Sequence, residues 1–271
     1  MAEVTSEEVV FRGQERPVEA LLVRPQEAGR HPALILVHEI WGLDDHIREV
    51  ARRFAAEGYV TLAPDLYTGP LREAMQPEKI RAGMEFLRQA PPEVQRDPAL
   101  LRARLAGMPP ERARALETLM DVLSPGRLDA FARDLLGAVA FLRARPEVDP
   151  ERIGSLGFCM GGGLSARLAT LSPELRACVV FYGENPPLEA VPAIRAAVLG
   201  LYGGEDARIT ETVPELARAM AEAGKRFTYH VYPGARHAFF NDTRPTYDAA
   251  AAADAWRRVL DFLGAELGGG R

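Results

Sequence analysis

Short apolar runs alternate with longer amphipathic stretches along most of the chain. Residues 33–37 form a continuous apolar run, and residues 177–181 and 227–232 are further runs rich in branched or aromatic side chains. Between such runs, residues 127–143 and 160–171 have the pattern of helices. This alternation is typical of a mostly parallel sheet with helices on both faces. It predicts the α/β fold class, with a fully buried central strand at residues 33–37.

The chain is predicted to open with an antiparallel hairpin. Its strands lie around residues 9–11 and over residues 18–23, joined by the polar turn 12–16. Asp44 or Asp45 can cap a helix that runs to about Glu57, where Gly58 ends it. The remaining elements alternate, with strands at 59–62, 152–156 and 196–202 and helices at 211–223 and 247–263.

Residues 66–127 interrupt this alternation. The segment is rich in arginine, punctuated by proline and helical in pattern, for instance over residues 77–87 and 111–122, and no convincing strand divides it. A chain of 271 residues is within the range of one large α/β unit. We therefore expect a single domain over residues 1–271, with residues 66–127 as a helical cap insertion.

Composition limits the partners and the location of the protein. Its 47% hydrophobic and 26% charged residues are those of an ordinary globular chain. The net charge of -5 includes no basic block, so we expect neither nucleic acid nor a membrane surface as a partner. The acidic start does not resemble a signal peptide, and no apolar run approaches the roughly 20 residues of a membrane span. Two cysteines without a disulfide framework fit a reducing, cytoplasmic location.

One of these cysteines stands in a nucleophile-elbow pattern. Cys159 lies between Gly157 and Gly161, at the junction of a predicted strand and a predicted helix, in a G-x-S-x-G pattern with cysteine replacing serine. The glycines leave room for a sharp turn, and the N-terminus of the following helix favours a thiolate. The alternative is that Cys159 is a small core residue. Cys178, inside the apolar run 177–181, fits that packing role.

A base and an acid are expected downstream, because in this type of fold the order is nucleophile, acid, histidine. His237 lies in a loop after the last predicted strand, and His38 is its only serious competitor. Glu205 and Asp206 follow the strand at 196–202, and we choose Asp206. The alternative is that either acid only caps the helix that follows.

Several short segments, together with the histidine loop, carry a family resemblance. They are HEIWG at 38–42, APDLY at 63–67, GFCMGG at 157–162 and GGED at 203–206. Together they resemble the dienelactone hydrolase family of the α/β-hydrolase superfamily over nearly the whole chain. The resemblance implies the α/β-hydrolase fold, a Cys-His-Asp triad of Cys159, His237 and Asp206, and no metal or organic cofactor. It also implies that Glu39 interacts with the cysteine and takes part in switching it between resting thiol and attacking thiolate.

The same resemblance suggests the surroundings of the nucleophile. The oxyanion hole would use the backbone N–H groups of Met160 and Ile40. We expect Trp41 and Phe239 to line the substrate pocket, although Trp41 also fits a packing role. Family members hold the carboxylate of their substrate with arginines, one of them shortly after the catalytic histidine. Here the first arginine after His237 is Arg244, so this chain departs from the family.

The predicted activity is hydrolysis of a small-molecule carboxylic ester or lactone by a monomer or small homo-oligomer. Cys159 thiolate would attack the carbonyl to give a tetrahedral intermediate and then a thioester, which water releases with the help of His237. Two alternatives remain: hydrolysis of another acyl bond, such as a thioester or a small peptide, and a non-catalytic thiol-sensing or binding module on the same fold.

Overall fold

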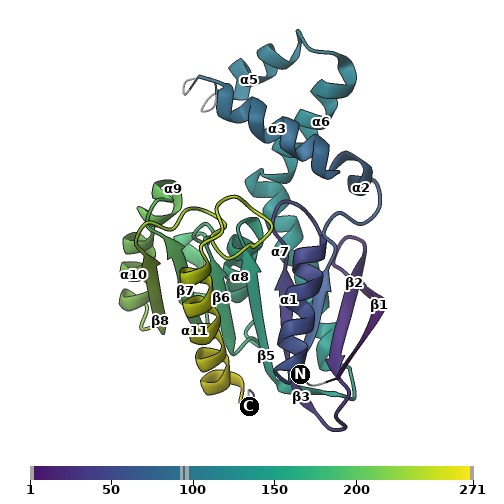
Figure 1. Ribbon diagram of the computed structural model, residues 1–271, viewed down its shortest axis with the longest axis vertical. Coiled ribbons are helices and arrows are strands. Elements are labelled where there is room, and N and C mark those ends of the chain that lie inside the picture. The colour runs from purple at the N-terminus through teal and green to yellow at the C-terminus, as the bar shows by residue number, and fades with distance from the viewer. Residues whose placement is uncertain (1–2, 92–93, 95–97, 269–271) are drawn as a thin grey trace.

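A single sheet organises the computed structural model of the protein, which describes residues 3–91, 94 and 98–268 (Figure 1). Its eight strands lie in the order β1-β2-β4-β3-β5-β6-β7-β8. The β1–β2 and β2–β4 pairs are antiparallel, and every later pair in this order is parallel. The strands are β1 (Val4–Arg12), β2 (Pro17–Pro25), β3 (His31–Val37), β4 (Val60–Pro64), β5 (Val148–Phe158), β6 (Ala177–Phe181), β7 (Ala197–Gly203) and β8 (Phe227–Tyr232).

Helices cover both faces of this sheet (Figure 1). On one face lie α1 (Asp45–Ala56) and α11 (Ala249–Leu267), whose apolar residues belong to one core cluster. The other face is covered by α7 (Pro125–Arg143), α8 (Met160–Leu171) and α10 (Val213–Glu222), which share a second cluster. The short helices α9 (Ala207–Thr210) and η1 (Leu188–Ala193) complete this part of the chain. The prediction of a mostly parallel sheet between two helical layers is confirmed.

The central strand β3 contributes to both cores. Leu34 and Leu36 belong to the cluster beneath α1 and α11, whereas Ala33, Ile35 and Val37 belong to the opposite cluster. Alternate side chains of a strand point to opposite faces, so a strand covered on both sides needs apolar residues throughout. This confirms the interpretation of residues 33–37 as a buried strand.

The opening hairpin is longer than its sequence pattern predicts. β1 pairs with β2 from Val4 to Arg12, whereas the apolar pattern indicated a strand only around residues 9–11. The missed residues include Ser6, Glu7 and Glu8, which are exposed on this edge strand. Because an edge strand keeps much of its surface in water, its sequence lacks the apolar run that marks a central strand.

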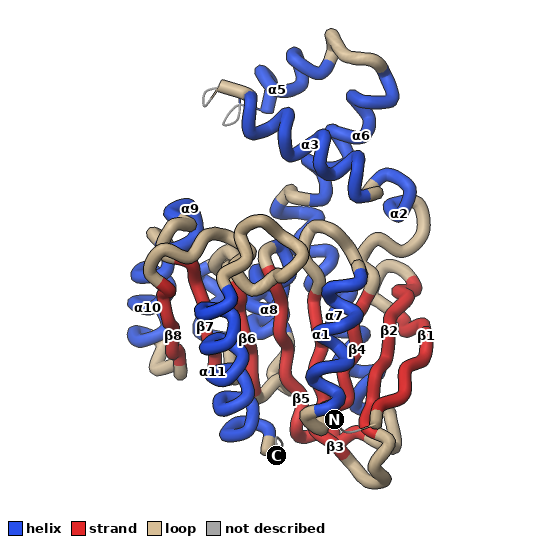
Figure 2. The backbone as a smooth tube through the Cα atoms, in the orientation of Figure 1, coloured by secondary structure: helices blue, strands red, loops and turns tan. Residues whose placement is uncertain are grey.

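Between β4 and α7 the described residues form helices and no strand. These cap helices are α2 (Leu71–Ala74), α3 (Pro77–Gln89), α5 (Pro98–Leu105) and α6 (Pro110–Val122). They stand beyond the carboxyl ends of the parallel strands, above the loops along that edge (Figure 2). A small core of their own joins Phe86, Leu101, Leu105 and Leu116. Among the described residues, no helix has both the length and the apolar character needed to cross a bilayer.

Candidate active site

Cys159 occupies a sharp turn between β5 and α8. Its backbone has φ 53° and ψ -118°, a conformation that residues with a side chain rarely adopt and that costs about 1–3 kcal/mol. Surrounding structure holds it there, because the Cys159 N–H donates to the Phe181 carbonyl at 3.0 Å. The flanking glycines permit the turn: a Cβ on Gly157 would lie 2.0 Å from the Gly161 carbonyl oxygen, and one on Gly161 would lie 2.3 Å from the Val37 carbonyl oxygen. The local geometry is that of a nucleophile elbow.

His237 and Asp206 meet at the same edge of the sheet. Asp206 follows β7, His237 lies in the loop after β8, and the His237 Nδ1 to Asp206 Oδ2 distance is 2.5 Å. Asp206 is only 8% exposed. With Nδ1 bound to the carboxylate, the other ring nitrogen is left for a proton transfer.

The charge of Cys159 also acts on the ring of His237. Burial lowers the pKa of His237, but the charge of the Cys159 thiolate and the hydrogen bond to Asp206 outweigh it and raise the pKa to about 10. The three side chains therefore form one electrostatic unit, in which the imidazolium is stabilised from both sides. This arrangement suits a histidine that holds a proton beside a cysteine side chain.

The choice between the two neighbouring acids follows from where their side chains lie. Asp206 occupies the N-cap position of α9, but its side chain makes no capping hydrogen bond there and binds His237 instead. The side chain of Glu205 is exposed, and its backbone N–H donates to the Ala235 carbonyl at 2.9 Å. The geometry favours Asp206 as the partner of the histidine over a role as a helix cap.

Glu39 is buried at 2% exposure just beyond the end of β3. The Tyr182 hydroxyl donates to Glu39 Oε1 at 3.1 Å, and the Asn241 amide donates to Glu39 Oε2 at 2.8 Å. Burial raises the pKa of Glu39, and the hydrogen bond from Asn241 opposes that rise. Each carboxylate oxygen of Glu39 thus accepts a hydrogen bond from a side chain that another loop provides.

Asn241 can present only its amide nitrogen to Glu39. The backbone N–H and the hydroxyl of Thr243 donate to Asn241 Oδ1 at 3.0 and 2.7 Å, which fixes that atom as the oxygen. Neither Asn241 nor Tyr182 was a predicted site residue. Tyr182 had a recognisable signal, because it directly follows the predicted strand 177–181 at the edge where the other site residues gather.

His38, the competing histidine, has a structural role. It is 0% exposed, and both ring nitrogens are bound to backbone: Nε2 accepts from Leu66 N–H at 3.1 Å, and Nδ1 donates to the Glu39 carbonyl at 2.5 Å. Burial lowers the pKa of His38 and keeps the ring neutral. It therefore ties the loop after β3 to the loop after β4.

A cavity of about 440 Å³ opens beside Cys159 and His237. Ile40 and Met160, whose N–H groups were predicted to form the oxyanion hole, both line it. The Tyr67 hydroxyl connects these two residues, donating to the Ile40 carbonyl at 2.9 Å and lying 3.8 Å from the Met160 sulfur. The volume is typical of a small-molecule site.

Trp41 and Phe239 lie elsewhere than the sequence predicted, because neither lines this cavity. Phe239 is 0% exposed and packs in the core against Tyr182 and Tyr232, with ring centroids 5.4 and 5.0 Å apart. Trp41 is covered by the guanidinium of Arg244, 4.0 Å from its ring centroid. The expectation that these two aromatic side chains form the substrate pocket is therefore corrected.

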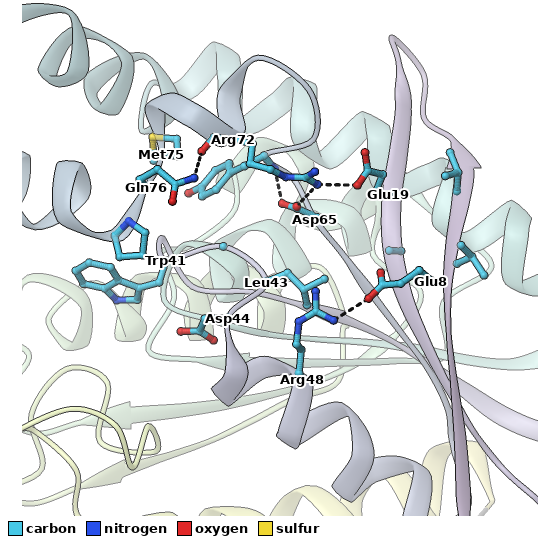
Figure 3. Close-up of a pocket in the computed structure, with 16 residues that line it drawn as sticks. Glu8, Glu19, Trp41, Leu43, Asp44, Arg48, Asp65, Arg72, Met75 and Gln76 are labelled. Carbon is cyan, nitrogen blue, oxygen red and sulfur yellow. Dashed lines mark hydrogen bonds and ion pairs between the residues drawn. The ribbon is translucent and has the colours of Figure 1, made fainter. Parts of the chain in front are cut away.

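Trp41 borders a different hollow of about 560 Å³, between the β1–β2 edge and the loops before α1 and α2 (Figure 3). Cys159 and His237 are not part of its lining. Its arginines are paired: Arg72 contacts Glu19 and Asp65 at 2.7 and 2.8 Å, and Arg48 contacts Glu8 at 2.8 Å. Although this hollow is larger, the cavity beside Cys159 is the candidate active site, because Cys159, His237 and Asp206 line that cavity.

Within the described part of the chain, no cluster of three or more His, Cys, Asp or Glu side chains could hold a metal ion.

Cys178 is 0% exposed in β6, with its sulfur 3.5 Å from the Ser165 hydroxyl. Burial raises the pKa of the Cys178 thiol to about 11, so this cysteine is a poor nucleophile.

Comparisons with known proteins bear on the family and the fold of the chain. The family model described as "Dienelactone hydrolase family" matches residues 18–267. A relative from Saccharolobus solfataricus named "Putative carboxymethylenebutenolidase" is 37% identical over 257 residues, which cover 94% of this chain and 97% of the relative. A relative of the same name from Synechocystis sp. is 31% identical, covering 96% of each chain.

A solved structure from Klebsiella pneumoniae, described as "Putative Dienelactone Hydrolase", has a TM-score of 0.71 and 29% identity and covers 97% of this chain and 99% of its own. The names of the family model and of these relatives indicate hydrolysis of ester or lactone bonds. The fold, the site and these similarities lead to one conclusion: the chain is a member of the dienelactone hydrolase family.

Proposed function

We propose that this protein hydrolyses carboxylic esters or lactones through a thioester on Cys159. Its thiolate attacks the substrate carbonyl, and the N–H groups of Ile40 and Met160 receive the developing oxyanion. His237 donates a proton to the departing alkoxide and then accepts one from the water that cleaves the thioester. Asp206 orients the ring and stabilises its charged form.

The observation that carries this proposal is the convergence of three side chains on one cavity. Cys159 stands on a strained elbow, His237 is hydrogen-bonded to Asp206, and all three residues line the cavity. Strain of this kind persists where surrounding structure enforces it, and it is common at functional sites. A packing role for Cys159 explains neither the strain nor the cavity.

Detection of the acyl-enzyme tests the proposal. The protein is mixed with p-nitrophenyl acetate, quenched in acid and digested for peptide mass spectrometry. We expect an acetyl group on Cys159 that hydroxylamine removes, together with a burst of nitrophenolate. Turnover without acylation of Cys159 contradicts the mechanism. Labelling of Cys159 by thiol reagents, with no turnover of esters, lactones, thioesters or small peptides, supports the thiol-sensing alternative instead.

Glu39 is proposed to accept the proton of the Cys159 thiol when substrate arrives, which requires its carboxylate form. Asn241→Leu removes the donor to Oε2, and loss of that stabilisation raises the pKa of Glu39 further. We expect the acidic limb of the pH profile of kcat/KM to move to higher pH. At pH values below the shifted limb activity falls by up to about tenfold, the size of one lost hydrogen bond to a charge, while activity well above the limb changes little.

Thr243→Val is the matched control for this prediction. It removes the hydroxyl bonded to Asn241 Oδ1 and leaves the backbone N–H that orients the amide. The pH profile should stay where it is. A uniform loss of activity at every pH in Asn241→Leu would show that the residue supports the fold and does not tune Glu39.

We also propose that residues 66–127 form a cap that selects the substrate within a single domain. Met84 and Leu87 of α3 line the cavity, whereas Cys159, Asp206 and His237 are placed by the sheet. Replacing residues 71–122 with a short linker should change the ranking of esters by acyl-chain length and leave Cys159 open to iodoacetamide. An unchanged ranking in the folded, shortened protein would deny the cap any part in selection.

A further inference from the structure

One group of residues that line the cavity beside Cys159 is apolar and partly exposed to water. It is formed by Met84, Leu87, Leu123 and Leu128, which come from α3, the end of α6 and α7. Met84 is 41% exposed and Leu123 is 37% exposed, so protein covers only part of each side chain. Gathering such side chains at a cavity is unfavourable in water unless a ligand covers them.

Apolar side chains from other elements line the same cavity. They are Ile40, Met160, Leu164 and Ile209. A substrate chain that enters the cavity can therefore contact hydrocarbon from both groups of residues. Such a lining gains about fourfold in binding for each methylene that it buries.

The arginines of the lining are already neutralised. Arg167 of α8 lies 2.5 Å from Asp129 of α7, and its side chain is 15% exposed. Arg208 lies 2.5 Å from Glu184. The Arg208–Glu184 pair is exposed and easily separated, whereas Arg167 is mostly buried. A substrate carboxylate that binds Arg167 would therefore have to compete with the resident carboxylate of Asp129.

We propose that this cavity takes the uncharged, apolar chain of an aliphatic ester or lactone, and that it discriminates against substrates whose chain carries a carboxylate. The inference rests on the proposed role of Cys159 as the nucleophile. Asp129 acts as a specificity-determining residue. It neutralises Arg167, which is less exposed than Arg208, the other arginine of the lining. The cavity would bind the apolar chain by hydrophobic contact next to the nucleophile.

Alkylation of Cys159 tests this pocket without requiring turnover. Three probes are compared on the whole protein: N-ethylmaleimide, N-hexylmaleimide and 6-maleimidohexanoic acid, with the labelled peptide identified by mass spectrometry. We expect the hexyl probe to react at least about tenfold faster than the ethyl probe, because four more methylenes are buried. The acid should react at least tenfold more slowly than the hexyl probe. A rate independent of chain length, or an acid as fast as the hexyl probe, overturns the proposal.

Variants of the ion pair sharpen the test. Asp129→Asn frees Arg167, and the ratio of the acid rate to the hexyl rate should rise at least tenfold. The control Asp121→Asn breaks the exposed Asp121–Arg127 pair, which is not part of the lining, and should leave the ratio unchanged. Should Asp129→Asn melt at a much lower temperature, Leu123→Lys adds a cation at an exposed position of the wall and should move the ratio the same way. An unmoved ratio in both folded variants overturns the proposal.

Turnover separates this inference from the proposed function. The comparison is repeated with two ester substrates, p-nitrophenyl hexanoate, whose acyl chain ends in a methyl group, and mono-p-nitrophenyl adipate, whose acyl chain ends in a carboxylate. Hydrolysis that favours the hexanoate at least tenfold supports both. If neither ester is hydrolysed while the maleimides still discriminate, the proposed function fails and the pocket assignment stands. If the adipate is hydrolysed as well as the hexanoate, the hydrolase stands and the pocket assignment fails.

Discussion

Cys159→Ala should lower kcat for ester hydrolysis by at least about 10⁴-fold, the scale of losing the nucleophile of a covalent triad enzyme. Cys178→Ala should keep most of the activity. The two cysteines differ in their placement: Cys159 stands on the elbow at the cavity, whereas Cys178 is 0% exposed inside β6. The measurement is kcat for a p-nitrophenyl ester, with thermal melts to check that each variant folds.

Cys159→Ser extends this prediction to the chemistry of the nucleophile. A hydroxyl has a far higher pKa than a thiol, so the serine variant has a much weaker nucleophile beside His237. It should lose nearly as much activity as the alanine variant. Equal losses from Cys159→Ala and Cys178→Ala in folded proteins would remove Cys159 from the mechanism.

The buried strands of the sheet were predictable because each of them carries a local apolar signal. The apolar run within β3 and the glycine-flanked elbow at Cys159 follow from packing on two faces and from a turn without room for side chains. Carboxyl ends of parallel strands meet at one edge, so residues that follow β5, β7 and β8 could be placed together from the sequence. The meeting of His237 with Asp206 is an instance of this rule.

The surroundings of Glu39 were predictable only in part, because Tyr182 follows a predicted strand whereas Asn241 has no such signal. Its donors, Tyr182 and Asn241, lie 143 and 202 residues further along the chain. Nothing in the local pattern says that these loops lie against one another or that Thr243 turns the Asn241 amide toward the carboxylate. Such contacts depend on loop conformations, and loops lack the repeating apolar pattern by which helices and strands are recognised in a sequence.

Adjacency in sequence also misled the prediction of the pocket wall. Trp41 follows the loop residues Glu39 and Ile40, but its ring packs under Arg244. Phe239 lies two residues after His237, but Ala238 between them has φ 62°, and Phe239 lies in the core. In a loop the direction of a side chain changes with each turn, so neighbours of a catalytic residue need not face its substrate.

Asp206→Asn should lower kcat by about 10²- to 10⁴-fold while the protein stays folded. The amide keeps the size of the side chain but removes the charge that stabilises the His237 imidazolium. Because the Asp206 hydrogen bond and charge raise the pKa of His237, their loss lowers it. The alkaline limb of the pH profile of kcat/KM should therefore move to lower pH, since the protonated ring is lost sooner as pH rises.

Glu205→Gln is the matched control, because it changes the neighbouring acid in the same way. The Glu205 side chain is exposed and is not the acid bound to His237, so kcat should change less than about twofold and the alkaline limb should not move. Reversed effects in the two variants would assign the orienting role to Glu205. If Asp206→Asn loses activity without a shift of the alkaline limb, the carboxylate positions the ring but does not stabilise its charge, because only the electrostatic role predicts that shift.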